Sequence, residues 1–168
     1  EQWESDHSEV TVYSTAADAQ DGEKISKSMK SRLDHTMENP ELKRRLAQIL
    51  GRRIGPEINR AHHYQGFRFD SFKVVCYDAE RGDLFAPHRD NTMPGNANRM
   101  FALSLNLNDD FEGGNVRFPE YGPHEYRPPA GGGLIFSCSL LHEALPVTRG
   151  KRFALLTFLR SLDRPPQG

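Results

Sequence analysis

The chain has 168 residues, and its 22 basic residues nearly balance its 23 acidic ones. This length suits one domain with a sizeable core and is short for two, and the balanced charge provides no broad field for nucleic acid or an anionic membrane. No apolar run approaches the roughly 20 residues needed to span a bilayer, so we expect a soluble single domain, residues 1–168, without nucleic-acid or membrane partners. Because the chain begins at Glu1 rather than at Met, a further domain or targeting segment before it stays open.

Residues 1–66 are predicted to be helical and to support the rest of the chain. A first helix is indicated by apolar residues spaced four apart at Ile25, Met29 and Leu33. A second helix is predicted to begin at Asn39-Pro40, because asparagine caps helix ends and proline suits the first helical position. Apolar residues then recur at near-helical spacing and predict an amphipathic helix packed on the core: Leu42, Leu46, Ile49, Leu50, Ile54 and Ile58.

From Phe67 the apolar period changes to two, which is typical of strands with one buried face. Tyr77 falls on the opposite face of its strand from Cys76. Cys76 and Cys138 both lie in apolar, strand-like runs, so we interpret them as buried thiols rather than as a disulfide. Free thiols fit a reducing compartment, and we expect a cytoplasmic protein.

The stretch from Met100 to Asn108 alternates cleanly between large apolar side chains and a second face that carries Ala102, Ser104 and Asn106. Small and polar side chains on an inward face are unusual for a dry barrel, and they favour a face that lines a cofactor cavity. Helices followed by many short strands predict a mainly β fold with N-terminal helices: a double-stranded β-helix (jelly roll, cupin-like) with its core in residues 67–160.

A His-x-Asp pair, His88 and Asp90, ends a short predicted strand. Side chains two apart in a strand share a face, so both can bind one ion. His142, far along the chain, supplies a second imidazole, and two imidazoles with one carboxylate make a facial triad that leaves three positions open on iron(II). The pair alone is a weak signal, for which two exposed polar residues at a strand end are the alternative. His124 is a competing imidazole, but it falls in a proline-rich connection.

Arg152 opens the last predicted strand, soon after His142. A guanidinium at this position can bind a dicarboxylate through two parallel hydrogen bonds, which an ammonium does less well. Arg149 and Lys151 are competing anchors, and strand alternation puts both on the opposite face from Arg152.

An ordered set of short segments runs from Tyr77 to Leu159, across about half of the chain. The segments are Cys76-Tyr77-Asp78, Phe85-Ala86-Pro87-His88-Arg89-Asp90, Arg99, Glu112-Gly113-Gly114, Phe118, His142-Glu143, Pro146-Val147-Thr148 and Gly150-Lys151-Arg152-Phe153-Ala154. In combination and order they resemble the 2-oxoglutarate- and iron(II)-dependent dioxygenases, specifically the prolyl-4-hydroxylase-like branch.

The resemblance implies a set of site residues. Iron(II) would be bound by His88, Asp90 and His142, Arg152 would bind the distal carboxylate of 2-oxoglutarate, and Tyr77 would donate a hydrogen bond to that cosubstrate. The resemblance also implies dioxygen as a reactant and ascorbate as an optional reductant.

Asn106 occupies a position where relatives of this branch often place another polar contact to the cosubstrate, frequently a tyrosine. The asparagine departs from that pattern, which leaves its contact with 2-oxoglutarate an open expectation.

The expected activity is hydroxylation of an unactivated C–H bond, coupled to decarboxylation of 2-oxoglutarate to succinate. The resemblance implies an amino-acid side chain, such as proline, in a protein or peptide. Two alternatives stay open: a small-molecule hydroxylase of the same superfamily, and a non-redox cupin that binds a metal such as zinc. The chemistry needs no protein acid or base, so Glu143 is expected to support the neighbouring ligand or to lie at the surface.

Overall fold

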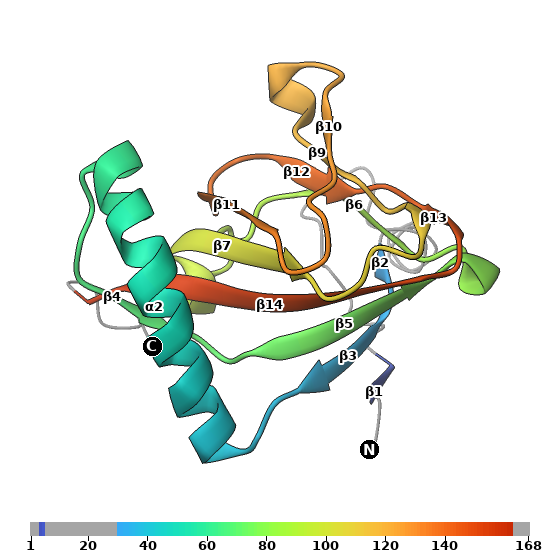
Figure 1. Ribbon diagram of the computed structural model, residues 1–168. Helices are drawn as coiled ribbons and strands as arrows, with labels where there is room; N and C mark the ends of the chain where they lie inside the picture. Colours follow the sequence, from blue (N-terminus) through green and yellow to red (C-terminus); the bar gives the residue numbers. More distant parts are fainter. Residues whose placement is uncertain (1–3, 6–29, 163–168) are drawn as a thin grey trace.

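The computed structural model describes residues 4–5 and 30–162, which form mostly antiparallel strands and, within those ranges, one α-helix (Figure 1). The elements in chain order are β1 (Glu4–Ser5), β2 (Lys30–Ser31), β3 (Leu33–Thr36), α2 (Pro40–His62), β4 (Phe67–Phe69), β5 (Lys73–Asp78), η1 (Ala79–Arg81), β6 (Leu84–His88), η2 (Pro94–Asn96), β7 (Arg99–Asn106), β8 (Glu112–Gly113), β9 (Val116–Arg117), η3 (Pro119–Tyr121), β10 (Glu125–Tyr126), β11 (Gly133–Ser137), β12 (His142–Ala144), β13 (Val147–Arg149) and β14 (Lys151–Ser161).

Two sheets make up most of the fold. The larger has seven strands in the order β1-β3-β5-β14-β7-β11, with β4 also paired to β14, and the smaller has five in the order β10-β9-β12-β6-β2. Strands β8 and β13 form a separate pair. Figure 1 shows β6, β9 and β12 as a second layer over β5, β14 and β7, and the segment with η3 and β10 projects from this second layer. This arrangement is consistent with the predicted jelly roll.

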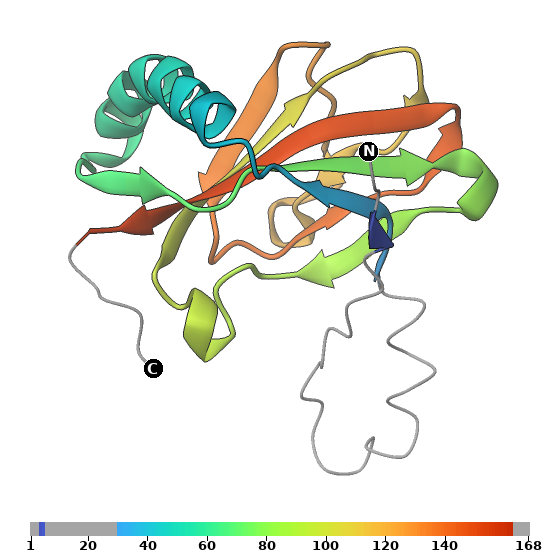
Figure 2. The ribbon, with the colours of Figure 1, turned by 90° about the horizontal axis from the view of Figure 1, so that it is seen from below.

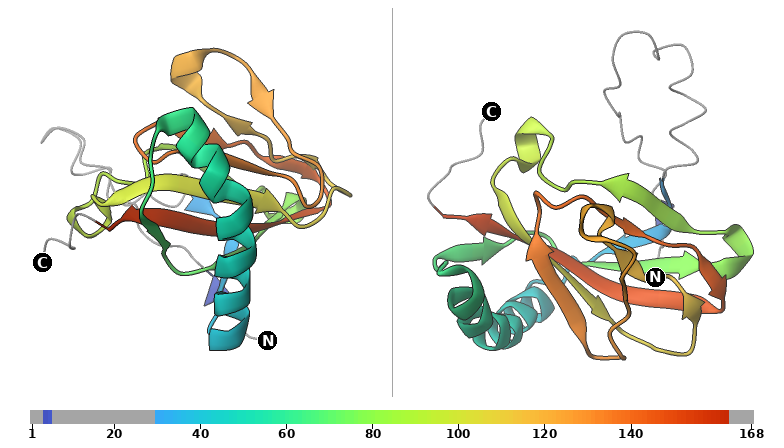
Figure 3. Two further views of the ribbon diagram at one scale, coloured as in Figure 1. Left: turned by 60° about the vertical axis from the view of Figure 1, so that its left-hand side comes forward. Right: turned by 90° about the horizontal axis from the view of Figure 1, so that it is seen from above.

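Helix α2 packs against the larger sheet, as its apolar spacing predicts. The Asn39 side chain accepts a hydrogen bond from the Leu42 backbone N–H at 3.0 Å, and the helix ends where His63 adopts a left-handed conformation. One face of the helix joins a core cluster with residues of the strands and of the loop before β5: Leu50, Ile54, Ile58, Phe72, Phe101, Leu103, Leu155 and Leu159. Each fully buried side chain of this kind contributes about 1.5–3 kcal/mol. Figures 2 and 3 show the helix on one side of the sheets.

The predicted first helix, around Ile25, Met29 and Leu33, is wrong in the part that the structure describes. Ile25 and Met29 lie outside the described residues, but Leu33 begins strand β3, which pairs with β5, and Lys30–Ser31 pairs with β6. Backbone pairing to existing sheet edges outweighs the weak local preference that a spacing of four residues suggested.

Cys76 and Cys138 are free and buried, which confirms their interpretation as thiols. Among the helices in the described ranges, none is long and apolar enough to cross a bilayer.

Candidate metal and cosubstrate site

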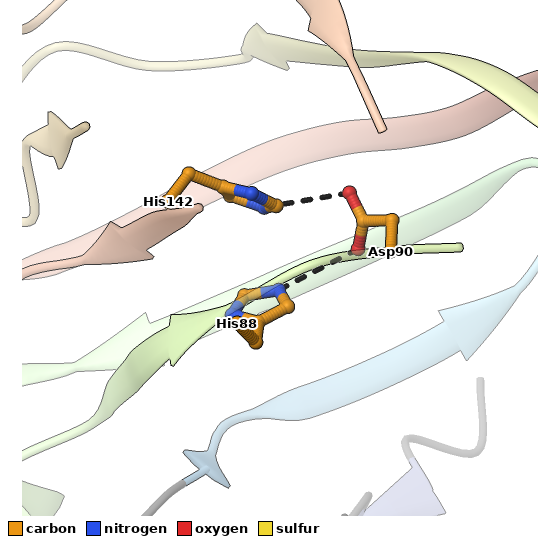
Figure 4. Close-up of side chains that lie close together, drawn as sticks. All are labelled: His88, Asp90 and His142. Atoms are coloured by element: carbon orange, nitrogen blue, oxygen red, sulfur yellow. Dashed lines mark ion pairs between the residues drawn. The ribbon is translucent and has the colours of Figure 1, made fainter. Parts of the chain in front are cut away.

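The structure brings His88, Asp90 and His142 together. His88 ends β6 and His142 begins β12, and these antiparallel strands place the two residues directly opposite each other. One potential ligand atom from each of the three residues lies within 4.8 Å of the others. The two Asp90 carboxylate oxygens lie 3.5 Å from His88 Nε2 and 3.4 Å from His142 Nε2 (Figure 4). The geometry therefore joins the three predicted ligands in one cluster.

Backbone carbonyls orient both imidazoles in the same way. His88 Nδ1 lies 2.8 Å from the Ala86 carbonyl oxygen, and His142 Nδ1 lies 3.0 Å from the Leu140 carbonyl oxygen. In the tautomer that suits these contacts, Nδ1–H donates and Nε2 keeps its lone pair for a metal. Phe85 also stacks on His88, with ring centroids 3.5 Å apart, which fixes that imidazole further.

The electrostatic environment favours the protonation states that a metal needs. Burial raises the pKa of Asp90, but the interactions with His88 and His142 outweigh it and hold the pKa below its usual value of 3.8. Burial also lowers the pKa of His142, which favours the neutral imidazole. A carboxylate and two imidazole nitrogens facing one point fit iron(II) with open positions for other ligands. His124 is exposed and outside this cluster.

A cavity between the sheets extends from the triad toward Arg152 and Tyr77. Ala102 and Ser104 line it, whereas Asn106, on the same predicted face, does not. That this cavity holds a cofactor stays a prediction. Arg152 and Tyr77 are register partners on the adjacent strands β14 and β5, and the Arg152 guanidinium lies 5.5 Å from the centre of the Tyr77 ring.

Arg152 is 4% exposed and is held by neutral groups. Its Nε donates to Asn106 Oδ1 at 3.0 Å, and its Nη2 donates to Ser104 Oγ at 3.2 Å. No carboxylate in residues 30–162 forms an ion pair with it. Burial lowers the pKa of Arg152, because the cation is desolvated, and the positive charge of Arg32 acts in the same direction. A buried cation without a counter-ion is costly, so a carboxylate ligand would stabilise this end of the cavity.

Asn106 lies behind Arg152 rather than in the cavity. It is 1% exposed, does not line the cavity, and its side-chain amide donates to the Pro128 carbonyl at 2.7 Å. Both ends of its amide are therefore used by the protein, and the predicted direct contact with the cosubstrate stays a prediction. In the structure Asn106 positions Arg152.

The competing anchors are paired elsewhere. Lys151 Nζ lies 2.9 Å from Asp78 Oδ2, and Arg149 Nη2 lies 2.7 Å from Glu112 Oε1. Neither lines the cavity. Strand alternation along β14 separates Lys151 from Arg152, as predicted, whereas Arg149 lies on a different strand, β13.

Three features of the site were missed or only partly anticipated in the sequence. Arg32 lines the cavity. The only sequence signal for it is weak: Arg32 and Asp34 are charged residues at alternate positions, which suits one face of a strand. Glu143 is buried, lines the cavity and pairs with Arg117 Nε at 2.7 Å. Gly114 has a φ of +65°, and a Cβ there would lie 3.1 Å from Arg152 Cδ, so the glycine makes room for the arginine.

Comparisons with known proteins agree with this geometry. A family model described as the 2OG-Fe(II) oxygenase superfamily matches residues 72–160. A PKHD-type hydroxylase of Synechococcus sp. (strain JA-2-3B'a(2-13)) is 32% identical over 104 residues, which are 58% of this chain and 46% of the relative. A PKHD-type hydroxylase of Xylella fastidiosa (strain M12) is 31% identical over 118 residues, 67% of this chain and 47% of the relative. The chain thus spans about half the length of these curated relatives.

Two solved structures show the same fold. The viral collagen prolyl hydroxylase of Paramecium Bursaria Chlorella virus-1 has a TM-score of 0.65 at 18% identity, covering 80% of this chain and 81% of that one. A Pseudomonas putida prolyl-4-hydroxylase has a TM-score of 0.63 at 21% identity, covering 87% of this chain and 83% of that one.

Proposed function

Because this chain belongs to the 2OG-Fe(II) oxygenase superfamily, we propose that it hydroxylates an amino-acid side chain, such as proline, in a protein or peptide. The observation that carries the proposal is one cavity with complementary ends. At one end a carboxylate and two imidazoles form a metal site, and at the other a buried arginine lacks an acidic partner in the described part of the chain. Iron(II) and 2-oxoglutarate together supply both missing charges.

The residues of this chain bind and orient the reactants. His88, Asp90 and His142 would hold iron(II), which supplies the oxidising chemistry with dioxygen and 2-oxoglutarate, yielding succinate. Arg152 would bind the distal carboxylate of the cosubstrate through its remaining N–H groups, and the Tyr77 hydroxyl would donate a hydrogen bond to the same cosubstrate. The chain need not provide an acid or base for this reaction.

The proposed substrate class rests on the names of the relatives, which are PKHD-type hydroxylases, and of the structural neighbours, which are prolyl hydroxylases. We also propose that residues 67–160 form the jelly-roll catalytic core of one domain. The two free thiols support our proposal of a cytoplasmic location. A zinc-binding cupin without redox activity would give the buried Arg152 no anionic partner, which argues against it.

Turnover of 2-oxoglutarate tests the activity. Purified protein with iron(II), oxygen and 2-oxoglutarate should form succinate, and His88→Ala should not. Incubating cell extract with wild-type protein and with His88→Ala, followed by mass spectrometry, should reveal peptides that gain one oxygen atom only with the wild type. Tight zinc binding without succinate formation would overturn the proposal, and a hydroxylated small metabolite without any modified peptide would overturn its substrate class.

A further inference from the structure

Arg32 lies where the chain crosses from one sheet to the other. Residues 30–31 form β2, which pairs with β6 of the smaller sheet, and β3 from Leu33 pairs with β5 of the larger sheet (Figure 1). Arg32 is 8% exposed and lines the cavity at this crossing. It precedes residues 72–160, which the family model matches, so the family match assigns it no role.

Two partners hold the Arg32 guanidinium. Its Nε and Nη2 donate to the two carboxylate oxygens of Asp34, at 2.6 and 3.1 Å, in a forked ion pair. Its Nη1 donates to the Tyr77 hydroxyl oxygen at 3.0 Å. Burial alone would lower the pKa of Arg32, but Tyr77 and Asp34 outweigh it and raise the pKa, so the group stays charged. Arg32 is thus paired with Asp34, which also pairs with Lys73 at 3.3 Å, whereas Arg152 pairs with no carboxylate of residues 30–162.

The contact with Arg32 determines the direction of the hydrogen bond that the Tyr77 hydroxyl can donate. A guanidinium has only donors, so the Tyr77 oxygen must accept from it and its own O–H must donate elsewhere. No residue of the described ranges accepts that proton, and Tyr77 lines the cavity beside Arg152. The hydroxyl proton is therefore available to a ligand that lies next to Arg152.

We propose that Arg32 is a positioning residue of the cosubstrate site, which holds the Tyr77 hydroxyl so that its proton points at a carboxylate-bearing ligand beside Arg152. This inference rests on the proposed function, in which that ligand is 2-oxoglutarate. It makes the segment before β5 a part of the site, acting through Tyr77 rather than by touching the ligand.

A double-mutant cycle tests this coupling without turnover. The readout is the affinity for 2-oxoglutarate of protein loaded with Mn(II), measured by calorimetry in the absence of iron. Tyr77→Phe and Arg32→Met should each weaken binding about tenfold, the size of one hydrogen bond to a charged group. The double variant should bind no more weakly than Tyr77→Phe alone, because both changes remove the same interaction. If the double variant lost affinity by the product of the two single losses, the inference would be overturned.

Further variants separate positioning from folding. Arg32→Lys keeps a donor for Tyr77 and should recover most of the affinity. Arg32→Met with Asp34→Asn removes both charges of the ion pair, so it tests the same coupling if Arg32→Met alone fails to fold. Arg160→Met, which removes another arginine paired with an aspartate but outside the cavity lining, should leave the affinity unchanged.

The outcomes also distinguish this inference from the function on which it rests. If wild-type protein with Mn(II) binds no 2-oxoglutarate, the proposed function fails. If the wild type binds it, and both Arg32→Met and its double variant with Asp34→Asn bind it equally well, only the role of Arg32 fails.

Discussion

The two ends of the cavity hold charge in opposite ways. At the metal end the carboxylate of Asp90 faces two imidazoles, and burial favours the neutral form of His142. At the anchor end the guanidinium of Arg152 faces a hydroxyl and an amide. A ligand of the opposite charge would stabilise each end, so the cavity suits a cation and an anion together.

The two ends also differ in their supports. Backbone carbonyls two residues away along the chain orient each imidazole, so the metal end is assembled largely from local geometry and one strand pair. Arg152 instead depends on Ser104 and Asn106 of another strand and on the space left by Gly114. Metal binding and cosubstrate binding should therefore be separable by mutation.

The largest effect is expected at the metal end. Asp90→Asn removes the anionic ligand with little change in shape, and should weaken iron(II) or Mn(II) binding by more than about 100-fold, since even a supporting partner is worth about 10–100-fold. Metal titration followed by calorimetry measures this. Asp109→Asn, at an exposed position, is the control. Undiminished metal binding in Asp90→Asn would show that Asp90 is not a metal ligand.

The anchor end should respond independently. Arg152→Met should weaken 2-oxoglutarate binding about 100-fold, because two hydrogen bonds to a carboxylate are lost, while metal affinity stays as in the wild type. The affinity of Arg152→Lys for 2-oxoglutarate should lie between those of the wild type and Arg152→Met, since an ammonium keeps the charge but not the two parallel hydrogen bonds. Lys151→Met is the matched control, because Lys151 pairs with Asp78 outside the cavity. A larger loss in Lys151→Met than in Arg152→Met would show that the anchor is misassigned.

The contrast between the two ends explains what the sequence could predict. Strand alternation predicts that His88 and Asp90 share a face, although Asp90 lies in a turn beyond the end of β6, and the same rule separates Lys151 from Arg152. The helix at Asn39-Pro40 was likewise readable from its capping signal. These are local regularities of the backbone.

Long-range supports were not readable in this way. Arg32 enters the cavity because residues 30–36 pair with two different sheets, and no local pattern near it specifies β6 or β5 as partners. Asn106 was predicted to contact the cosubstrate, but its neighbours Arg152 and Pro128 are distant in the sequence. Gly114 is part of the segment Glu112-Gly113-Gly114 in the sequence, and its proximity to Arg152 appears only in three dimensions.

A substitution at Gly114 should have a smaller effect, and it tests whether Arg152 needs the space that this glycine leaves. In Gly114→Ala the new Cβ would lie 2.9 Å from Val147 Cγ2 and 3.1 Å from Arg152 Cδ, at a φ of +65°. We expect 2-oxoglutarate binding to weaken about tenfold and stability to fall by about 1–3 kcal/mol, with metal affinity unchanged. Gly131→Ala has a similar φ of +78° and open space around it, so it controls for backbone strain alone. Equal losses of affinity in the two variants would show that contact with Arg152 is irrelevant.

The smallest effect concerns the pH dependence of the metal-free protein. The pKa of His142 in the folded chain is held below its ordinary value of 6.5, chiefly by burial. Above pH 6.5 both folded and unfolded chains keep this imidazole neutral, and its contribution to stability is fully present. As the pH falls from 6.5 toward the lowered pKa of the folded state, the unfolded chain binds the proton first, and stability is lost by at most about 1.4 kcal/mol per pH unit. His142→Gln should flatten this part of the curve in denaturant melts of metal-free protein. Asp90 would lose its charge only below pH 3.8, outside this part of the curve. An unchanged slope in His142→Gln would therefore mean that burial does not hold His142 neutral.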